Sequence, residues 1–219
     1  MKEYIGFIEK CPLFSGIAED DLLKMLDCMG AVVKGYKRND FIFRAGEKAG
    51  RIGVALSGTI QIIREDYNGN CSINSVIAAP GIFAEAFACA GKKKFPVSAV
   101  AREKCTVLFL DYGKMEKVCT DGSSFKVISN LLNIVANKNV MLDKKIEVLS
   151  KRTTREKIMT YLFSEASSHG SSSFTIPYNR QELADFLCVE RSAMSAEISK
   201  LCREKVIETK KSSFRLLEK

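Results

Sequence analysis

The sequence predicts an α+β protein in three parts: a β-rich N-terminal domain (1–121), one long helix (122–150) and a small helix-turn-helix domain (151–219). Short apolar, β-branched runs separated by turn residues fill the stretch 31–111. After Asp121 the apolar period changes from two to about three and a half residues, which indicates a long helix. The C-terminal part then combines short amphipathic helices with a hairpin pattern.

The N-terminal domain is expected to be a sandwich or small barrel, because its strands are short and closely spaced. Asn68-Gly69 is a strong hairpin signal, since both residues tolerate positive φ. Ahead of the strands, Asp20-Asp21 opens a short amphipathic helix whose acidic start suits the helix dipole. The predicted strands are Asp40–Phe43, Ile52–Leu56, Thr59–Arg64, Cys71–Ala78, Val97–Ala101 and Thr106–Leu110.

The long helix carries a heptad pattern that predicts a parallel dimer seam. Its apolar a and d residues are Ile128, Leu131, Val135, Leu142 and Leu149. Lys138 and Lys145 occupy the two remaining d positions, which weakens a strict coiled coil and leaves packing on the helix's own domain as the alternative. Ser150–Thr154 contains no apolar residue and is the expected hinge into the last domain.

Residues 179–207 carry the pattern of a helix-turn-helix. Asn179 and Glu182 form a capping box, and after a break at Cys188-Val189 a second helix begins near Glu190. In this motif the second helix enters the DNA major groove with its N-terminus first. Its exposed N-terminal half is expected to hold Arg191, Ser192, Ser195 and Ala196.

A hairpin with a basic tip at Lys210 and Lys211 follows and suits a flanking phosphate. The alternative is an ordinary helical pair in a core, since such patterns also arise by chance. Net charge does not decide between them: residues 152–219 hold 12 basic and 9 acidic side chains, and residues 1–151 hold 22 and 17. The overall charge of +8 is therefore not concentrated on this domain.

Composition argues against several other classes. His169, the single histidine, lies in a Ser-rich loop, and the chain has no phosphate-binding Gly loop, His-Glu-x-x-His or Gly-x-Ser-x-Gly motif. We therefore expect no enzyme, no metal and no cofactor. The eight cysteines include no Cys-x-x-Cys pair and are expected to be reduced and mostly structural. Lacking a signal-peptide or membrane-helix pattern, the protein is expected to be cytoplasmic and away from membranes.

The whole chain resembles the Crp/Fnr family of bacterial transcription regulators. The resemblance rests on Leu13–Ile17 with Asp21-Leu22, on Phe41–Glu47, on Leu56–Ile62, and on Arg180–Leu187 leading into Arg191–Ser195. It implies an N-terminal β-roll of the cyclic-nucleotide-binding type, a dimerisation helix and a C-terminal winged helix. It also implies a homodimer that binds a near-palindromic operator in double-stranded DNA, senses a small-molecule effector and contacts RNA polymerase.

By this resemblance, Arg180 and Gln181 contact the phosphate backbone, and Arg191 and Ser192 face base edges. Ala196 stands where many members have a second Arg, so a different operator is expected. The complete expected DNA-binding set is Arg180, Gln181, Glu190, Arg191, Ser192, Ser195, Ala196, Lys210 and Lys211.

The effector site departs from the family pattern. Cyclic-nucleotide-binding members follow a Gly-Glu pair with an Arg and a Ser or Thr about ten residues later, because a buried phosphate needs charge-assisted donors. Here Ala84-Glu85 is followed by Phe95 and Pro96, so the donors are missing and neither cAMP nor cGMP is expected to bind. An apolar or aromatic acid packed on Phe87 and Phe95 is one possible effector. The expected pocket comprises Glu85, Phe87, Phe95, Ser98 and Leu142.

Two alternative functions remain open from the sequence. Cys11 and Cys202, in different domains, leave room for a thiol-redox-responsive regulator. A ligand-binding module that acts on another protein is the second alternative, although it gives residues 179–217 no purpose. An iron–sulfur cluster is disfavoured, since Cys11 and Cys28 are too few and too far apart.

Overall fold

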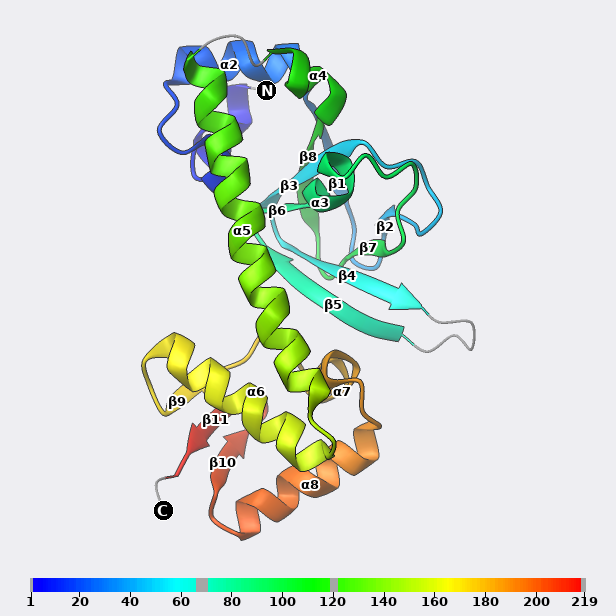
Figure 1. Ribbon diagram of the computed structural model, residues 1–219, viewed down its shortest axis with the longest axis vertical. Helices are drawn as coiled ribbons and strands as arrows, with labels where there is room; N and C mark the ends of the chain where they lie inside the picture. Colours follow the sequence, from blue (N-terminus) through cyan, green and yellow to red (C-terminus); the bar gives the residue numbers. More distant parts are fainter. Residues whose placement is uncertain (1, 66–70, 119–121, 218–219) are drawn as a thin grey trace. The chain divides into compact units, whose positions relative to one another are not determined.

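The computed structural model describes residues 2–65, 71–118 and 122–217 and confirms the predicted α+β class (Figure 1). The chain divides into two units, one of residues 1–70 and 74–138 and the other of residues 71–73 and 139–219. The long helix α5 (Gly122–Ser150) is thus shared between the units instead of forming a part of its own. The boundary expected after residue 121 lies outside the described residues.

The first unit contains two four-stranded sheets with the strand orders β1-β8-β3-β6 and β2-β7-β4-β5. The first sheet consists of β1 (Val32–Tyr36), β8 (Cys105–Asp111), β3 (Arg51–Ser57) and β6 (Gly81–Phe83), all in antiparallel pairs. The second consists of β2 (Phe41–Phe43), β7 (Ser98–Ala101), β4 (Thr59–Glu65) and β5 (Cys71–Ala78).

Within the described residues of the first unit, all six predicted strands are present, together with two strands that the sequence did not predict. The missed strand β1 lies at a sheet edge and is largely exposed, so it lacks the apolar alternation of a half-buried strand. The other, β6, is only three residues long. Strands β4 and β5 are neighbours, as expected of strands that flank a hairpin, but the Asn68-Gly69 turn itself lies outside the described residues.

Two apolar clusters hold the first unit together. One includes Ala55, Ile60, Ala99 and Val107 from both sheets. The other packs the N-terminal helices on β3 and β8 and includes Leu131 of α5. The helices of this unit are the 3-10 turns η1 (Lys2–Tyr4) and η2 (Pro12–Phe14), with α1 (Ile5–Ile8), α2 (Glu19–Cys28), α3 (Glu85–Cys89) and α4 (Tyr112–Val118).

The second unit has the predicted helix-turn-helix and hairpin. Its three-stranded sheet has the order β10-β11-β9, with antiparallel pairs. Residues 151–153 separate α5 from α6, at the position of the expected hinge. The elements are α6 (Thr154–His169), β9 (Ser173–Thr175), α7 (Arg180–Leu187), α8 (Arg191–Arg203), β10 (Ile207–Lys210) and β11 (Ser213–Leu216).

The exposed apolar face of α5 differs from the predicted dimer seam. Leu131 is only 7% exposed and packs in the core of the first unit, so it does not lie on this face. Lys138 and Lys145, at the other predicted d positions, donate to the backbone carbonyls of Ile82 and Ile73. The predicted register is therefore corrected, because this row of the helix packs on the chain itself.

A neighbouring row of α5 supplies the exposed stripe. Phe125, Ile128, Leu132, Leu142 and Ile146 are all exposed and follow one another at heptad spacing. Val135 and Leu149 are half-buried on the same stripe, and Asn139 interrupts it. Four of the five predicted seam residues thus lie on the stripe. The positions that alternate with them are residues 125, 132, 139 and 146, and not 131, 138 and 145. No helix within the described ranges is long and apolar enough to span a membrane.

Candidate nucleic-acid interface and effector pocket

Local backbone chemistry fixes the geometry of α7 and its turn. The predicted capping box is confirmed: Asn179 Oδ1 accepts from the Glu182 N–H at 3.0 Å, and Glu182 Oε2 accepts from the Asn179 N–H at 2.8 Å. At the other end, Cys188 adopts a left-handed conformation (φ 51°), which stops the helix. Residues 188–190 connect α7 to α8.

Glu190 acts as the N-cap of α8. Its carboxylate accepts from the Ala193 N–H at 2.8 Å and from the Ser192 hydroxyl, and these hydrogen bonds hold the pKa of Glu190 below its ordinary value. A carboxylate also suits the positive end of the helix dipole. Glu190 therefore shapes the start of α8, in addition to lying on the surface that the sequence assigns to DNA.

The expected recognition face of α8 is open to solvent. Met194, Ile198 and Leu201 are buried against the rest of the unit. Arg191, Ser192 and Ala196 are exposed, and Ser195 is half-buried. The first turn of α8 therefore presents an exposed guanidinium, that of Arg191, at the place where a recognition helix contacts base edges.

Arg180 is placed differently from the expected phosphate contact. Its Nη2 donates to Thr209 Oγ1 at 2.9 Å, and its guanidinium carbon lies 5.0 Å from the ring centroid of Phe214. Burial lowers the pKa of Arg180, and its Nη1 is buried without a hydrogen-bond partner in the described part of the chain. The side chain thus ties α7 to the hairpin. Sequence reasoning missed this because the contact depends on how β10 and β11 pack.

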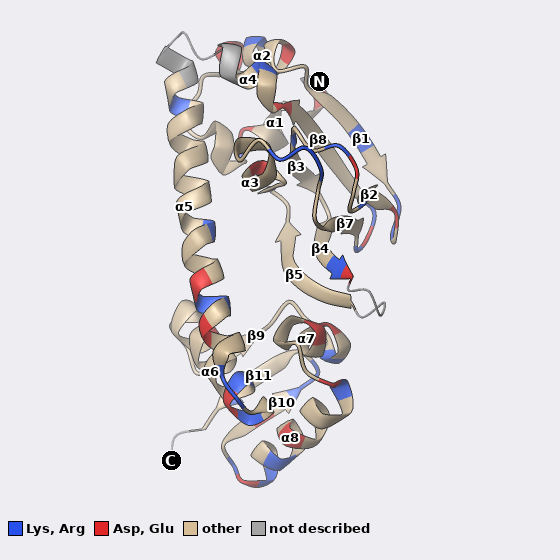
Figure 2. Cartoon of the chain, turned by 45° about the vertical axis from the view of Figure 1, so that its right-hand side comes forward, with Lys and Arg blue, Asp and Glu red and all other residues tan. Residues whose placement is uncertain are grey.

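Other cationic and polar groups remain accessible. Gln181 is exposed and donates to Asp185 Oδ1 at 2.8 Å. Lys210 and Lys211 are exposed at the tip of the β10–β11 hairpin, where Lys211 has a φ of 55°. Figure 2 shows Lys and Arg on both units. The expected DNA-binding face is therefore identified by where its residues lie on α8 and the hairpin, and not by its total charge.

In the first unit, Glu85 is held by Lys138, which the sequence places at a heptad d position of the long helix. The side chain of Glu85 is 3% exposed, and its Oε1 accepts from Lys138 Nζ at 2.8 Å. The same ammonium donates to the Ile82 carbonyl at 2.5 Å. Glu85 Oε2 is buried and has no hydrogen-bond partner among the residues that the structure describes.

Aromatic rings surround the position where the family places phosphate donors. Phe95 is buried and stacks on Phe43 at a centroid distance of 3.9 Å, and Phe87 meets Phe95 edge-on at 6.0 Å. Ser98 accepts from the Ala45 N–H at 3.0 Å through its hydroxyl. Leu142 belongs to the second unit and is 55% exposed. Phe95 thus occupies the position at which the family resemblance expects a cationic phosphate donor.

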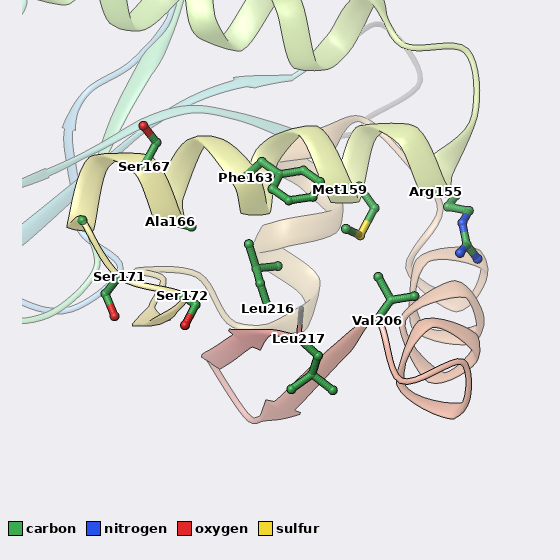
Figure 3. A pocket seen from close by; sticks show the side chains of 11 residues that line it. Arg155, Met159, Phe163, Ala166, Ser167, Ser171, Ser172, Val206, Leu216 and Leu217 are labelled. Carbon is green, nitrogen blue, oxygen red and sulfur yellow. The ribbon is translucent and has the colours of Figure 1, made fainter. Parts of the chain in front are cut away.

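Each unit also has a cavity. A volume of about 610 Å³ in the first unit is lined by polar and charged side chains such as Lys34, Tyr36 and Asp111, and by Phe95. In the second unit, Met159 and Phe163 of α6 face Val206, Leu216 and Leu217 across a groove of about 830 Å³ (Figure 3). Of the predicted effector residues, Phe95 lines the cavity of the first unit.

Arg155, the charged residue that lines the groove in Figure 3, is already paired. Its guanidinium binds Glu197 at 3.0 Å and Glu204 at 2.6 Å, which joins α6 to α8 and its C-terminal end. These hydrogen bonds raise the pKa of Arg155. The groove is thus mainly apolar, and the guanidinium of Arg155 is used in ion pairs within the unit.

The thiols give little support to a redox switch through Cys11. Cys11 is fully buried, and burial raises the pKa of its thiol. Cys202 is half-buried and belongs to the other unit. A thiolate nucleophile at Cys11 is therefore disfavoured on physical grounds.

Family comparisons match the two ends of the chain. A cyclic nucleotide-binding domain matches residues 33–121, and a Crp-like helix-turn-helix domain matches residues 156–219. No curated protein matches the sequence.

Solved structures share the fold along most of the chain. The c-di-GMP-responsive global regulator CLP of Xanthomonas campestris aligns with a TM-score of 0.70 at 16% identity, over 91% of this chain and 100% of that one. FixK2 of Bradyrhizobium japonicum aligns with 0.66 at 16%, over 86% and 93%. The catabolite activator protein of Thermus thermophilus aligns with 0.55 at 21%, over 94% of each chain.

Proposed function

Because this chain belongs to the Crp/Fnr family of transcription regulators, we propose that it is a homodimer that binds a specific, near-palindromic DNA operator. The observation that carries this proposal is the exposed first turn of α8 in a Crp-like helix-turn-helix. Arg191 is free there to bind guanine O6 and N7 through two hydrogen bonds. Lys210 and Lys211 supply phosphate contacts from the hairpin, and RNA polymerase is the further partner on DNA.

The proposed dimer forms through the exposed stripe of α5. Leu132 is 68% exposed and Ile146 is 64% exposed, although both are large apolar residues. A second copy of the same helix would cover them in parallel, with Asn139 facing its counterpart and fixing the register. Two recognition helices in such a dimer would meet half-sites about one helical turn, roughly 34–36 Å, apart.

We also propose that the first unit does not use a cyclic nucleotide as its effector. Lys138 neutralises Glu85 from within the chain, and Phe95 stands where a phosphate donor is needed. A negative phosphate next to these rings would be buried without a matching cation. The expectation of an aromatic acid stacked on Phe95 is also weakened, because that ring is only 6% exposed.

Selection of sites from a random pool of double-stranded DNA tests the regulator proposal. The wild-type protein should enrich a two-fold symmetric sequence, with its affinity measured by fluorescence anisotropy at several salt concentrations. Failure to enrich any sequence would contradict the proposal.

Two variants test the assigned DNA surface. Arg191→Ala should lose about 1–3 kcal/mol of discrimination at one base pair in each half-site. Lys210→Ala should instead weaken binding equally for all sequences and make the salt dependence shallower. If Arg191→Ala keeps both affinity and site preference, the recognition face is assigned wrongly.

A further inference from the structure

Lys145, in the last part of α5, joins three segments of the second unit through one ammonium group. Its Nζ donates to the Ile73 carbonyl at 2.6 Å and lies 4.3 Å from the ring centroid of Phe186 on α7. Ile73 ends the short stretch Cys71–Ile73 of β5 that belongs to this unit. The contact therefore connects α5 and β5 with the first helix of the helix-turn-helix.

Phe186 transmits this contact to the core of the DNA-binding part. Its ring stacks on Tyr178 at a centroid distance of 4.7 Å and lies 5.3 Å from Tyr161 of α6. Leu187, the next residue, is buried and ends α7 before the turn into α8. A displacement of Phe186 would consequently move the base of the recognition helix.

The contact also bridges a break in the helical backbone. Residues 151–153 lie between α5 and α6, and such short segments absorb changes of backbone angle when parts of a protein rotate. Lys145 lies before this break, whereas Phe186 lies after it. A contact of this kind limits the angle between residues 139–150 of α5 and α7, which the covalent connection alone leaves variable.

The chemistry of the Lys145 side chain is better suited to fixing the orientation of α7 than to filling apolar space. Its side chain is half-buried, and desolvation lowers its pKa, so the charged form is less favoured than in water. An apolar side chain would avoid this desolvation. It would not hold a backbone carbonyl and an aromatic face in one fixed arrangement, as an ammonium does.

We propose that Lys145 is a positioning residue that sets the orientation of α7 and α8 relative to the dimer helix, and so the half-site spacing that the protein accepts. This inference rests on the proposed DNA-binding function. It concerns the distance between two recognition helices, and not the contacts that either helix makes with bases.

DNA duplexes of varied spacing test the proposal. The probes carry the half-site that the wild-type protein selects, as a single copy or as inverted pairs whose spacing is changed by one or two base pairs. Lys145→Met should reduce the preference for the best spacing about tenfold while single half-site affinity stays within about twofold. Lys145→Arg keeps a cation over the ring and should restore the preference.

The matched control is Lys144→Met, which changes the same residue type on the exposed neighbouring position of α5. It should retain the wild-type spacing profile. An unchanged spacing profile in Lys145→Met would overturn the proposal. An equal loss of affinity at single and paired half-sites would also overturn it, because such a loss indicates only a structural role for Lys145.

Hydrogen exchange without DNA separates this proposal from the proposed function. Lys145→Met should speed amide exchange at least about threefold in α7 and in residues 139–150, with α2 as the internal reference. Unchanged exchange in these segments would contradict the anchor even if the protein binds DNA. If exchange becomes faster but the protein selects no DNA sequence, the contact between α5 and α7 is supported. Its role in operator spacing and the proposed function are then both wrong.

Discussion

Lys138 Nζ lies 2.8 Å from the carboxylate of Glu85, whose side chain is 3% exposed. The lysine belongs to α5 and the glutamate opens α3, so the ion pair joins these two helices within the first unit. A buried carboxylate needs a compensating charge, and here the chain supplies that charge itself. One carboxylate oxygen of Glu85 is thus already engaged within the chain.

Removing the lysine should therefore destabilise the first unit. We expect Lys138→Met to lower the free energy of unfolding by about 3 kcal/mol, because Glu85 would be left buried without its cation. Urea denaturation measures this loss. Adding Glu85→Gln to Lys138→Met should recover part of it, since the buried charge is then gone.

Lys144→Met, on the exposed face of the same helix, is the control and should change stability by less than about 0.5 kcal/mol. A loss of similar size in both variants would mean that the pairing with Glu85 is not the source of the effect.

The sequence predicts local features of the fold well, because they depend on neighbours along the chain. The capping box at Asn179 and the start of α8 next to Glu190 are examples. Lys138 and Arg180 show the limit of such reasoning. The sequence places Lys138 at a heptad d position and Arg180 at the DNA phosphates, yet each binds a group that is distant along the chain. Only tertiary packing determines which face of a helix such residues occupy.

Cyclic nucleotides provide a test of the pocket chemistry. We expect isothermal titration with cAMP or cGMP to give no binding in the micromolar range, because Phe43 and Phe95 stack where a phosphate needs donors. Phe95→Arg serves as a comparison, since it introduces a cation beside the same rings. Micromolar binding of cAMP to the wild-type protein would contradict this prediction.

The corrected seam on α5 predicts which substitutions break the dimer. Leu132→Asp should shift the protein to monomers at micromolar concentration, because it places charge in the centre of the apolar stripe. Val140→Asp is the matched control: Val140 is 57% exposed but lies off the stripe, so the dimer should persist. Sedimentation velocity distinguishes the two states.

Asn139 gives the same seam a second test. A polar residue at one core position fixes register at a cost in stability, so Asn139→Ile should strengthen association and permit assemblies larger than a dimer. Sedimentation equilibrium measures both effects. If Asn139→Ile leaves association unchanged while Leu131→Asp abolishes it without unfolding the protein, the original register was right.

Tyr161 provides a stability test in the second unit. The side chain is 4% exposed, and its hydroxyl has no hydrogen-bond partner in the described part of the chain. Burial also raises the pKa of Tyr161, so the phenol stays neutral. Because an unsatisfied buried hydroxyl is costly, Tyr161→Phe should raise the free energy of unfolding by about 1 kcal/mol in urea denaturation. Tyr161→Leu should instead lose stability, since it removes the ring contact with Phe186 as well. A loss in Tyr161→Phe would show that the hydroxyl has a partner in solution, such as a bound water.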